Sequence, residues 1–174
     1  NNLLNAKIIF GEITMQEIIG FNWQDKRNGQ CGQYAFTHAL LVLGIPVSIR
    51  EAHRLQKWPI WKTSDIGTDE EKIKRGLKKC NCKAIEYTVY DDQEAKKIVD
   101  DLLNQDCPVI ICTNNYNHWA VIAGKMGKNK YIWIDSSDDD LIGSWKWQDI
   151  ADWIACENDD GSFEHYILGV KPKD

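Results

Sequence analysis

Three residues that lie far apart in the sequence have side chains that could together perform nucleophilic catalysis. Cys31 follows the polar, glycine-containing segment Asn28-Gly29-Gln30 and begins an apolar run that ends at Leu43. His118 starts a second apolar run, and Asp135 ends a third. A cysteine nucleophile needs a base to take its proton, and the base needs a third group to orient it. These three residues are therefore a candidate nucleophile, base and orienting carboxylate.

The run over residues 31–43 predicts a helix that begins at the candidate nucleophile. It is apolar nearly all round, which is typical of a buried helix, and Gly44-Ile45-Pro46 would end it. A helix N-terminus carries partial positive charge and unpaired backbone N–H groups. A thiol placed there is more readily held as the thiolate, and the free N–H groups can stabilise an oxyanion beside it.

A hairpin is expected to bring His118 and Asp135 together. Residues 118–123 and 130–135 read as two strands joined by a loop with two glycines, which predicts antiparallel pairing. The start of one strand then lies beside the end of its partner. A lone buried cysteine or histidine is more often structural than catalytic. The combination of all three residues is what favours the catalytic interpretation.

The other segments complete the expected fold. Thr68-Asp69-Glu70-Glu71 matches a capping box, and Asp91 is a second candidate helix cap. The remaining predicted helices cover residues 13–19, 68–79, 91–103 and 144–156, and the remaining strands cover 84–90, 108–113 and 163–170. Helices come first and mainly antiparallel strands follow, with one helix between them, so the layout is α+β.

Length and composition limit the class of protein. The chain has 174 residues, 43% of them hydrophobic and 27% charged, which predicts one globular domain over residues 1–174. The net charge of −5 makes nucleic acid and anionic membranes poor candidate partners. No apolar run approaches the roughly 18 residues of a membrane span, and no signal peptide is visible, so we expect a soluble protein of undetermined compartment. Its oligomeric state is also left open.

Further motifs occur in the order that they have in a known group of enzymes. Gln24 precedes the pair Cys31-Gly32, and later motifs follow in Gly67-Thr68, Pro108-Val109-Ile110, His118-Trp119-Ala120-Val121 and Asp135. Because of these motifs and their order, most of the chain resembles the papain-like cysteine peptidases in their small bacterial form. The nearest resemblance is to the double-glycine leader peptidases (peptidase family C thirty-nine) and their stand-alone relatives. It implies a papain-like fold in which a central Cys-bearing helix packs on an antiparallel sheet.

The resemblance also implies an activity and roles. It implies hydrolysis of a peptide or isopeptide bond in a peptide or protein substrate, through a thioester and without cofactor or metal. Cys31 would attack, His118 would transfer the proton and Asp135 would orient the ring, while Gln24 and the Cys31 N–H would hold the oxyanion. Gln24 lies one residue further from the cysteine than is usual in the family, so Gln30 is the alternative donor. Ser136 stands where the family often has Pro.

Two other functions stay open. Gly29-Gln30-Cys31 and Gly44-Ile45-Pro46-Val47 are similar to segments of transglutaminase-like proteins, which suggests an acyltransferase or a glutamine deamidase. The polar loop 113–117 favours hydrolysis over transfer. A catalytically degenerate peptide-binding module is the non-enzyme alternative. No phosphate-binding Gly-x-x-x-x-Gly-Lys-Ser/Thr motif is present, so we expect a stand-alone enzyme rather than a complete leader-processing transporter.

Several other side chains received a structural interpretation. The cysteine spacing in Cys80-Asn81-Cys82 is too short for a zinc pair, and the acidic run 138–140 reads as a solvated loop. The six cysteines permit disulfides, which a chain of this length does not need. His38, His53 and His165 are interpreted as structural or surface residues. Trp119 is expected to shield the catalytic hydrogen bond from water.

Overall fold

The described helices and strands form an α+β fold, as the sequence predicted. The computed structural model describes residues 29–59 and 67–173, so the predicted helix over 13–19 and Gln24 lie outside the described residues. The helices are α2 (Cys31–Val42), α3 (Ile49–Gln56), α5 (Glu70–Lys79), α6 (Asp92–Asn104) and α7 (Trp147–Ile154). The strands are β1 (Cys82–Val89), β2 (Val109–Thr113), β3 (His118–Met126), β4 (Lys130–Ile134), β5 (Ile142–Lys146), β6 (Cys156–Glu157) and β7 (Phe163–Pro172).

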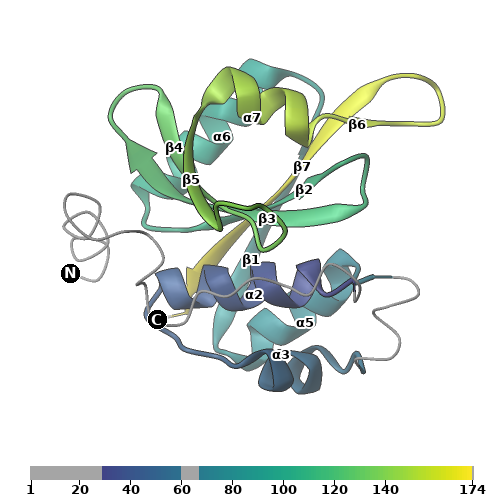
Figure 1. Ribbon diagram of the computed structural model, residues 1–174, viewed down its shortest axis with the longest axis vertical. Helices are drawn as coiled ribbons and strands as arrows, with labels where there is room; N and C mark the ends of the chain where they lie inside the picture. Colours follow the sequence, from purple (N-terminus) through teal and green to yellow (C-terminus); the bar gives the residue numbers. More distant parts are fainter. Residues whose placement is uncertain (1–28, 60–66, 174) are drawn as a thin grey trace.

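The strands pair in the order β1-β7-β2-β3-β4-β5, with β6 beside β7, and every pairing is antiparallel. Helices α2, α3 and α5 cover one face of the sheet, and α6 and α7 cover the other (Figure 1). Successive residues of β3 alternate between the two cores: Val121 packs on the α2 side and Ile122 on the α7 side. Because both faces are covered, every residue of the central strand β2 is buried.

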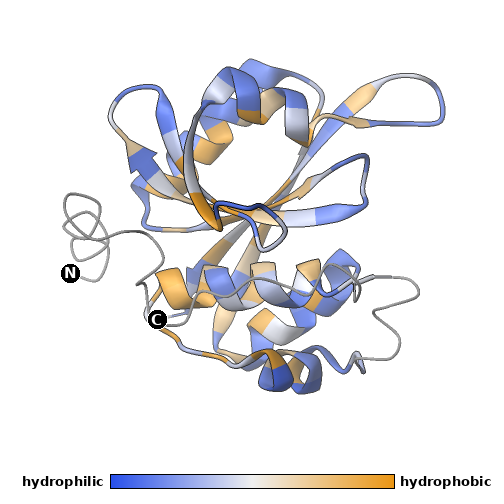
Figure 2. Ribbon diagram, viewed as in Figure 1, coloured by the Kyte–Doolittle hydropathy of each residue, from blue (hydrophilic) through white to orange (hydrophobic). Residues whose placement is uncertain are grey.

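Helix α2 occupies the centre of one layer. Its residues Phe36 and Leu40 are fully buried and pack in the same core as Val121 and Ile134 of the sheet. In Figure 2, hydrophobic residues line the side of α2 that faces the sheet, whereas the outer helix α3 is mostly hydrophilic. Gly44, with φ +76°, ends the helix as the sequence predicted. The buried position of α2 explains why its sequence is apolar nearly all round.

Two helix starts refine the predicted caps. The N-cap of α5 is Asp69, whose side chain accepts from Lys72 N, so the predicted capping box is displaced by one residue from Thr68. Thr68 is instead buried among other polar groups beneath α2. Asp91 caps α6 as predicted, accepting from Gln93 N and Glu94 N.

The segment predicted as a Trp-rich helix over 144–156 was wrong at both ends. Residues up to Lys146 belong to β5, which pairs with β4 in the register Ile134↔Ile142, and the helix begins only at Trp147. Cys156 already belongs to β6. Pairing with a neighbouring strand therefore overrides the local helical pattern. Helix α3 was not predicted, although Ser48 caps it by accepting from Glu51 N.

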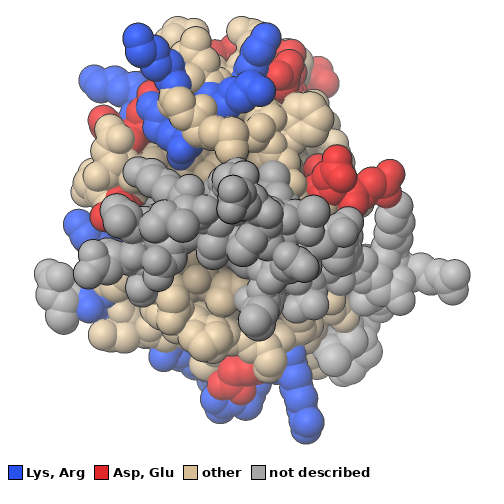
Figure 3. Space-filling model, turned by 60° about the vertical axis from the view of Figure 1, so that its left-hand side comes forward, with Lys and Arg blue, Asp and Glu red and all other residues tan. Residues whose placement is uncertain are grey.

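Charged side chains are unevenly distributed over the surface. On the face shown in Figure 3, the largest group of basic side chains lies at the top of the view and others lie at the bottom, while acidic side chains occur in several separate groups. Within residues 29–59 and 67–173, no helix combines the length and the apolar character that a membrane span requires.

Candidate active site

Cys31 is the first residue of α2, as predicted, and its side chain is buried with 6% exposure. The N-cap is Gln30, which makes no side-chain hydrogen bond to the helix, and the first turn contains no acidic residue. The positive end of the helix therefore remains available to an anion at the Cys31 sulfur.

Gly32 allows the start of α2 to approach the segment before α5. A Cβ atom at Gly32 would lie 2.6 Å from Thr68 Cβ and 2.9 Å from its Cγ2. Contacts this short do not occur between real side chains, so any larger residue would push the helix and Thr68 apart. The packing of α2 against Thr68 therefore requires a glycine directly after Cys31, the candidate nucleophile.

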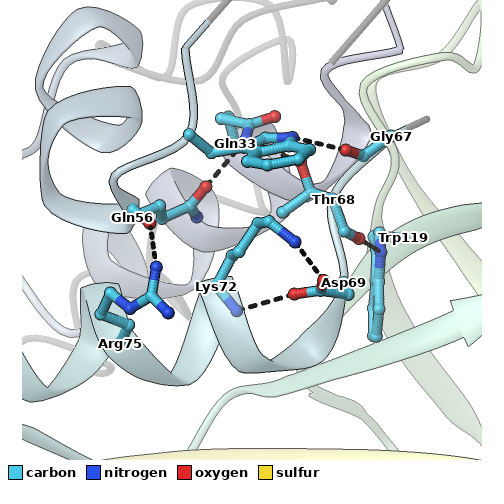
Figure 4. Close-up of polar contacts among 9 residues, drawn as sticks. Gln33, Gln56, Gly67, Thr68, Asp69, Lys72, Arg75 and Trp119 are labelled. Atoms are coloured by element: carbon cyan, nitrogen blue, oxygen red, sulfur yellow. Dashed lines mark hydrogen bonds and ion pairs between the residues drawn. The ribbon is translucent and has the colours of Figure 1, made fainter. Parts of the chain in front are cut away.

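Buried side-chain hydrogen bonds tie α2 to its neighbours. Gln33 Nε2 donates to Gln56 Oε1 at 2.8 Å and to Thr68 Oγ1 at 2.7 Å, and Trp119 Nε1 donates to the Thr68 carbonyl at 2.7 Å (Figure 4). Arg75 donates to the backbone carbonyl of Gln56 at 3.2 Å. We call Gln33, Gln56, Thr68 and Trp119 the polar network. It connects α2 with α3, with the start of α5 and with β3.

The expectation that Trp119 shields the catalytic hydrogen bond stays a prediction. Its indole donates to the Thr68 carbonyl and stands edge-on to the Tyr166 ring, with 5.8 Å between ring centroids. Trp119 packs in the same core as Cys31, on the α2 side of the sheet.

The hairpin brings His118 and Asp135 together, as predicted. His118 Nε2 lies 2.6 Å from Asp135 Oδ1, and the two residues are only 8% and 5% exposed. The register Val121↔Ile134 places Asp135, which directly follows β4, near the start of β3. Because Nε2 faces the carboxylate, Nδ1 is the ring nitrogen left for the Cys31 sulfur, which lies near enough to raise the pKa of the His118 ring.

The electrostatics of this cluster favour a charged pair. Burial by itself lowers the pKa of His118, but the hydrogen bonds to Asp135 and Cys31 outweigh it and raise that pKa to about 10. Burial likewise raises the pKa of Asp135, yet the hydrogen bond from His118 outweighs this and leaves the pKa of that carboxyl below its ordinary value. His118 is therefore favoured as an imidazolium, paired with the Asp135 carboxylate.

Ser137 also belongs to the cluster, although the sequence analysis did not select it. Its backbone N–H donates to Asp135 Oδ1 at 2.9 Å, and its hydroxyl donates to the same oxygen at 2.8 Å. The hydroxyl oxygen lies 3.1 Å from His118 Nε2. The sequence signal was the Asp-x-Ser spacing, since a carboxylate commonly accepts from the backbone two residues later.

A cavity of about 400 Å³ adjoins His118 and Asp135. None of its lining residues comes from α2, so it lies on the histidine side of the pair. Its walls combine three tryptophans, the acidic run predicted to be a solvated loop, and polar residues at the end of β2. The lining residues are Thr113, Asn114, His118, Trp133, Asp135, Ser137, Asp138, Asp139, Asp140, Trp145 and Trp153.

The remaining candidate residues are the other cysteines and histidines, which could form disulfides or bind a metal. All six cysteines are free thiols. The described residues contain no group of three or more His, Cys, Asp or Glu side chains arranged to hold a metal ion. His53 is hydrogen-bonded to the Trp58 carbonyl at 2.8 Å, and His165 to Asp92 at the start of α6 at 2.8 Å, as expected for structural histidines.

A pair of neighbouring thiols lies close to the site. The hydrogen bond with Cys156 and burial both raise the pKa of Cys112, and the charge of Cys31 raises it further. The same contact lowers the pKa of Cys156 to about 7. Cys156 is therefore a second thiol that must be resolved from Cys31 in any labelling experiment.

Comparison with known proteins rests on the fold. No family profile matches the sequence, and no curated protein does. Among solved structures, the chain is similar to the peptidase domain of Streptococcus ComA, a bifunctional ABC transporter of a quorum-sensing pathway, with 15% identity, a TM-score of 0.57 and coverage of 87% of this chain and 96% of that one. A double-glycine motif protease from an AMS/PCAT transporter, solved with its leader peptide, has 17% identity, a TM-score of 0.62 and coverage of 87% and 91%.

A third similar structure is the N-terminal peptidase-like domain of the toxin secretion ATP-binding protein from Vibrio parahaemolyticus. It has 13% identity and a TM-score of 0.57, and the match covers 83% of this chain and 98% of that one. At sequence identities this low, the similarity is one of fold alone. The chain has the papain-like α+β fold and resembles the peptidase domains of family C thirty-nine.

Proposed function

We propose that this protein is a cysteine peptidase that hydrolyses a peptide or isopeptide bond, in one catalytic domain formed by the whole chain. The observation that carries the proposal is the arrangement of three side chains. Cys31, at a helix N-terminus, lies near enough to His118 to raise the pKa of its ring, and that ring is 2.6 Å from Asp135. Nucleophile, base and orienting group in hydrogen-bonding reach of one another are the requirements for covalent catalysis by a thiol.

In the first half of the reaction, the Cys31 sulfur attacks the substrate carbonyl carbon and forms a C–S bond. The carbonyl oxygen becomes an oxyanion, which the Cys31 N–H at the start of α2 stabilises together with Gln24 or Gln30. As the C–N bond breaks, His118 gives its proton to the leaving nitrogen. Asp135 keeps the imidazole oriented and stabilises its charged form.

In the second half, His118 takes a proton from water as the water attacks the thioester carbonyl. Breaking the C–S bond then releases the carboxylic acid and restores the thiolate–imidazolium pair. The cavity beside His118 supports hydrolysis, because an open and partly polar space admits water to the acyl-enzyme. Thr113 and Asn114 of the polar loop line it, whereas Asn115 and Asn117 are hydrogen-bonded within the protein.

The experiment is cleavage of a diverse synthetic peptide mixture, with products identified by mass spectrometry. The wild type is expected to cleave a subset of peptides, and Cys31→Ala is expected to cleave none. The control Cys107→Ala removes another buried thiol that touches none of the three residues and should retain activity. Cleavage by Cys31→Ala at the wild-type rate would contradict the proposal.

A second arm separates hydrolysis from the alternatives. With a millimolar primary amine present, a peptidase releases mainly carboxylic acid products, whereas an acyltransferase releases mainly amides. Glutamine deamidation without chain cleavage would instead support a deamidase. A chain that binds peptides but neither cleaves them nor reacts with a thiol-directed probe at Cys31 would be a degenerate binding module.

A further inference from the structure

The cavity beside His118 has an aromatic wall of three tryptophans. Trp153 stands edge-on to Trp133, with 5.6 Å between ring centroids, and edge-on to Trp145, with 5.1 Å between them. Trp133 is buried, but Trp145 and Trp153 are each 39% exposed. Two large aromatic side chains that remain partly in solvent beside a cavity are typical of a binding surface.

A second part of the cavity wall is acidic. Asp138, Asp139 and Asp140 lie on the connection between β4 and β5 and line the cavity together with Asp135. His118, paired with Asp135, is the positive group among the lining residues, and no Lys or Arg is among them in the described part of the chain. Burial, followed by the charge of Asp135, raises the pKa of Asp138, so a further positive charge in this space would favour its carboxylate.

Aromatic faces together with carboxylates suit one kind of side chain. A Lys or Arg side chain can lay its apolar stem against an indole, and its charge interacts favourably with the indole face. Its head then reaches the carboxylates, while the aspartates themselves are not arranged as a metal site in the described residues. An aliphatic side chain would contact only the tryptophans, and an acidic side chain would be repelled by the aspartates.

We propose that this cavity is a subsite for a Lys or Arg side chain of the peptide substrate, on the leaving-group side of the scissile bond. The proposal rests on the function proposed above. The side is inferred from the position of the cavity, which adjoins His118, the donor of the proton to the leaving nitrogen, and includes no residue of α2. Trp145 and Trp153 contact the stem of the side chain, and Asp139 and Asp140 hold its charge.

The first test measures binding without catalysis. The Cys31→Ala variant, labelled with ¹⁵N, is titrated with arginyl-glycinamide, and the indole signals of Trp145 and Trp153 are followed by NMR. The matched control ligand is citrullyl-glycinamide, which has nearly the same shape without the side-chain charge. We expect saturable shifts of both indoles and about tenfold weaker binding of the citrulline ligand.

A charge-neutralising variant then tests the acidic wall. Asp139→Asn/Asp140→Asn, made in the Cys31→Ala background, should weaken arginyl-glycinamide binding about tenfold and leave citrullyl-glycinamide binding unchanged. The control Asp101→Asn/Asp106→Asn changes net charge equally at two exposed residues outside the cavity. Equal binding of the two ligands, an unchanged affinity in the first variant, or no shift of either indole would overturn the proposal.

The second test uses the active protein and separates the two proposals. Peptides cleaved by the wild type should carry Lys or Arg enriched just after the cleaved bond, and Asp139→Asn/Asp140→Asn should lose this enrichment. Cleavage without any such preference would overturn the subsite and leave the peptidase standing. Selective binding of the arginine ligand without cleavage of any peptide would support the subsite and contradict the peptidase.

Discussion

The two sides of the candidate active site are stabilised in different ways. On the Cys31 side, helix α2 is fixed by a filled interface, where Gly32 leaves no room for a Cβ and Gln33 is hydrogen-bonded at zero exposure. On the His118 side, the residues adjoin an open cavity with half-exposed tryptophans. Cys31 is thus held by packing, whereas His118 borders an open cavity.

The filled side includes unfavourable interactions. Gln33 Oε1 and Gln56 Nε2 are buried without a partner among the described residues. An unsatisfied buried polar atom is destabilising, so an apolar interface of equal volume could be as stable. What the polar network adds is a fixed geometry, because its directional hydrogen bonds set the position of α2 against Thr68. This difference leads to different effects of mutation on each side.

The largest effect is expected on the open side, in reactivity. His118→Ala removes the base and the positive charge beside Cys31, so peptide cleavage should fall by about 10²–10⁴-fold. Alkylation of Cys31 by iodoacetamide at pH 7 should fall with it, while alkylation of Cys156 in the same sample stays unchanged. Peptide mapping by mass spectrometry resolves the two thiols. Unchanged alkylation of Cys31 would show that His118 does not act on the sulfur.

The next effect is expected on the filled side, in stability. Gly32→Ala forces a Cβ against Thr68, and overpacking of this kind destabilises by about 1–3 kcal/mol. The free energy of unfolding from urea denaturation measures it. The matched control is Gly124→Ala, whose Cβ would meet only Ile132 Cδ1 at an ordinary 3.5 Å. Equal effects of the two substitutions would mean that the α2 interface is not tightly filled.

The same contrast explains what could be predicted from the sequence. The hairpin that pairs His118 with Asp135 and the helix that begins at Cys31 follow from local patterns of apolar and turn residues. The polar network could not be predicted, because Gln33, Gln56 and Thr68 come from three separate segments and meet only through tertiary packing. The cavity wall was missed because Trp145 belongs to β5, and only pairing with β4 makes that segment a strand.

A third prediction concerns pH. The folded pKa of His118, about 10, lies above its ordinary 6.5, so its contribution to stability is fully present below about pH 6.5 and is lost as pH rises towards 10. The lowered pKa of Asp135 gives the opposite sign, with stability present above pH 3.8 and lost as pH falls below it. The free energy of unfolding of the wild type should therefore exceed that of His118→Gln by about 1–3 kcal/mol at pH 6.

That difference should shrink steadily between pH 6.5 and 10, as followed by urea denaturation at each pH. Asp135→Asn, which removes the partner carboxylate, should show the same flattened profile as His118→Gln. A stability difference between wild type and His118→Gln that stays constant up to pH 10 would mean that His118 is not held as an imidazolium in the folded protein.

The smallest expected effect separates orientation from charge on the open side. Ser137→Ala removes a hydroxyl that donates to Asp135 at 2.8 Å and lies 3.1 Å from His118, while the backbone N–H of residue 137 still donates to the carboxylate. Because the carboxylate keeps this backbone donor, losing the hydroxyl should cost about 0.5–1.5 kcal/mol, which corresponds to a twofold to tenfold loss of cleavage rate. Ser137→Thr keeps the hydroxyl and should retain most of the activity, whereas Ser136→Ala serves as the neighbouring control. If Ser137 positions the ring, the upper pH limit of peptide cleavage, which needs protonated His118 to donate to the leaving nitrogen, should also fall in Ser137→Ala, because the Asp135–His118 pair loses a donor that orients it. A lower rate with an unchanged pH profile would instead assign Ser137 to the wall of the cavity.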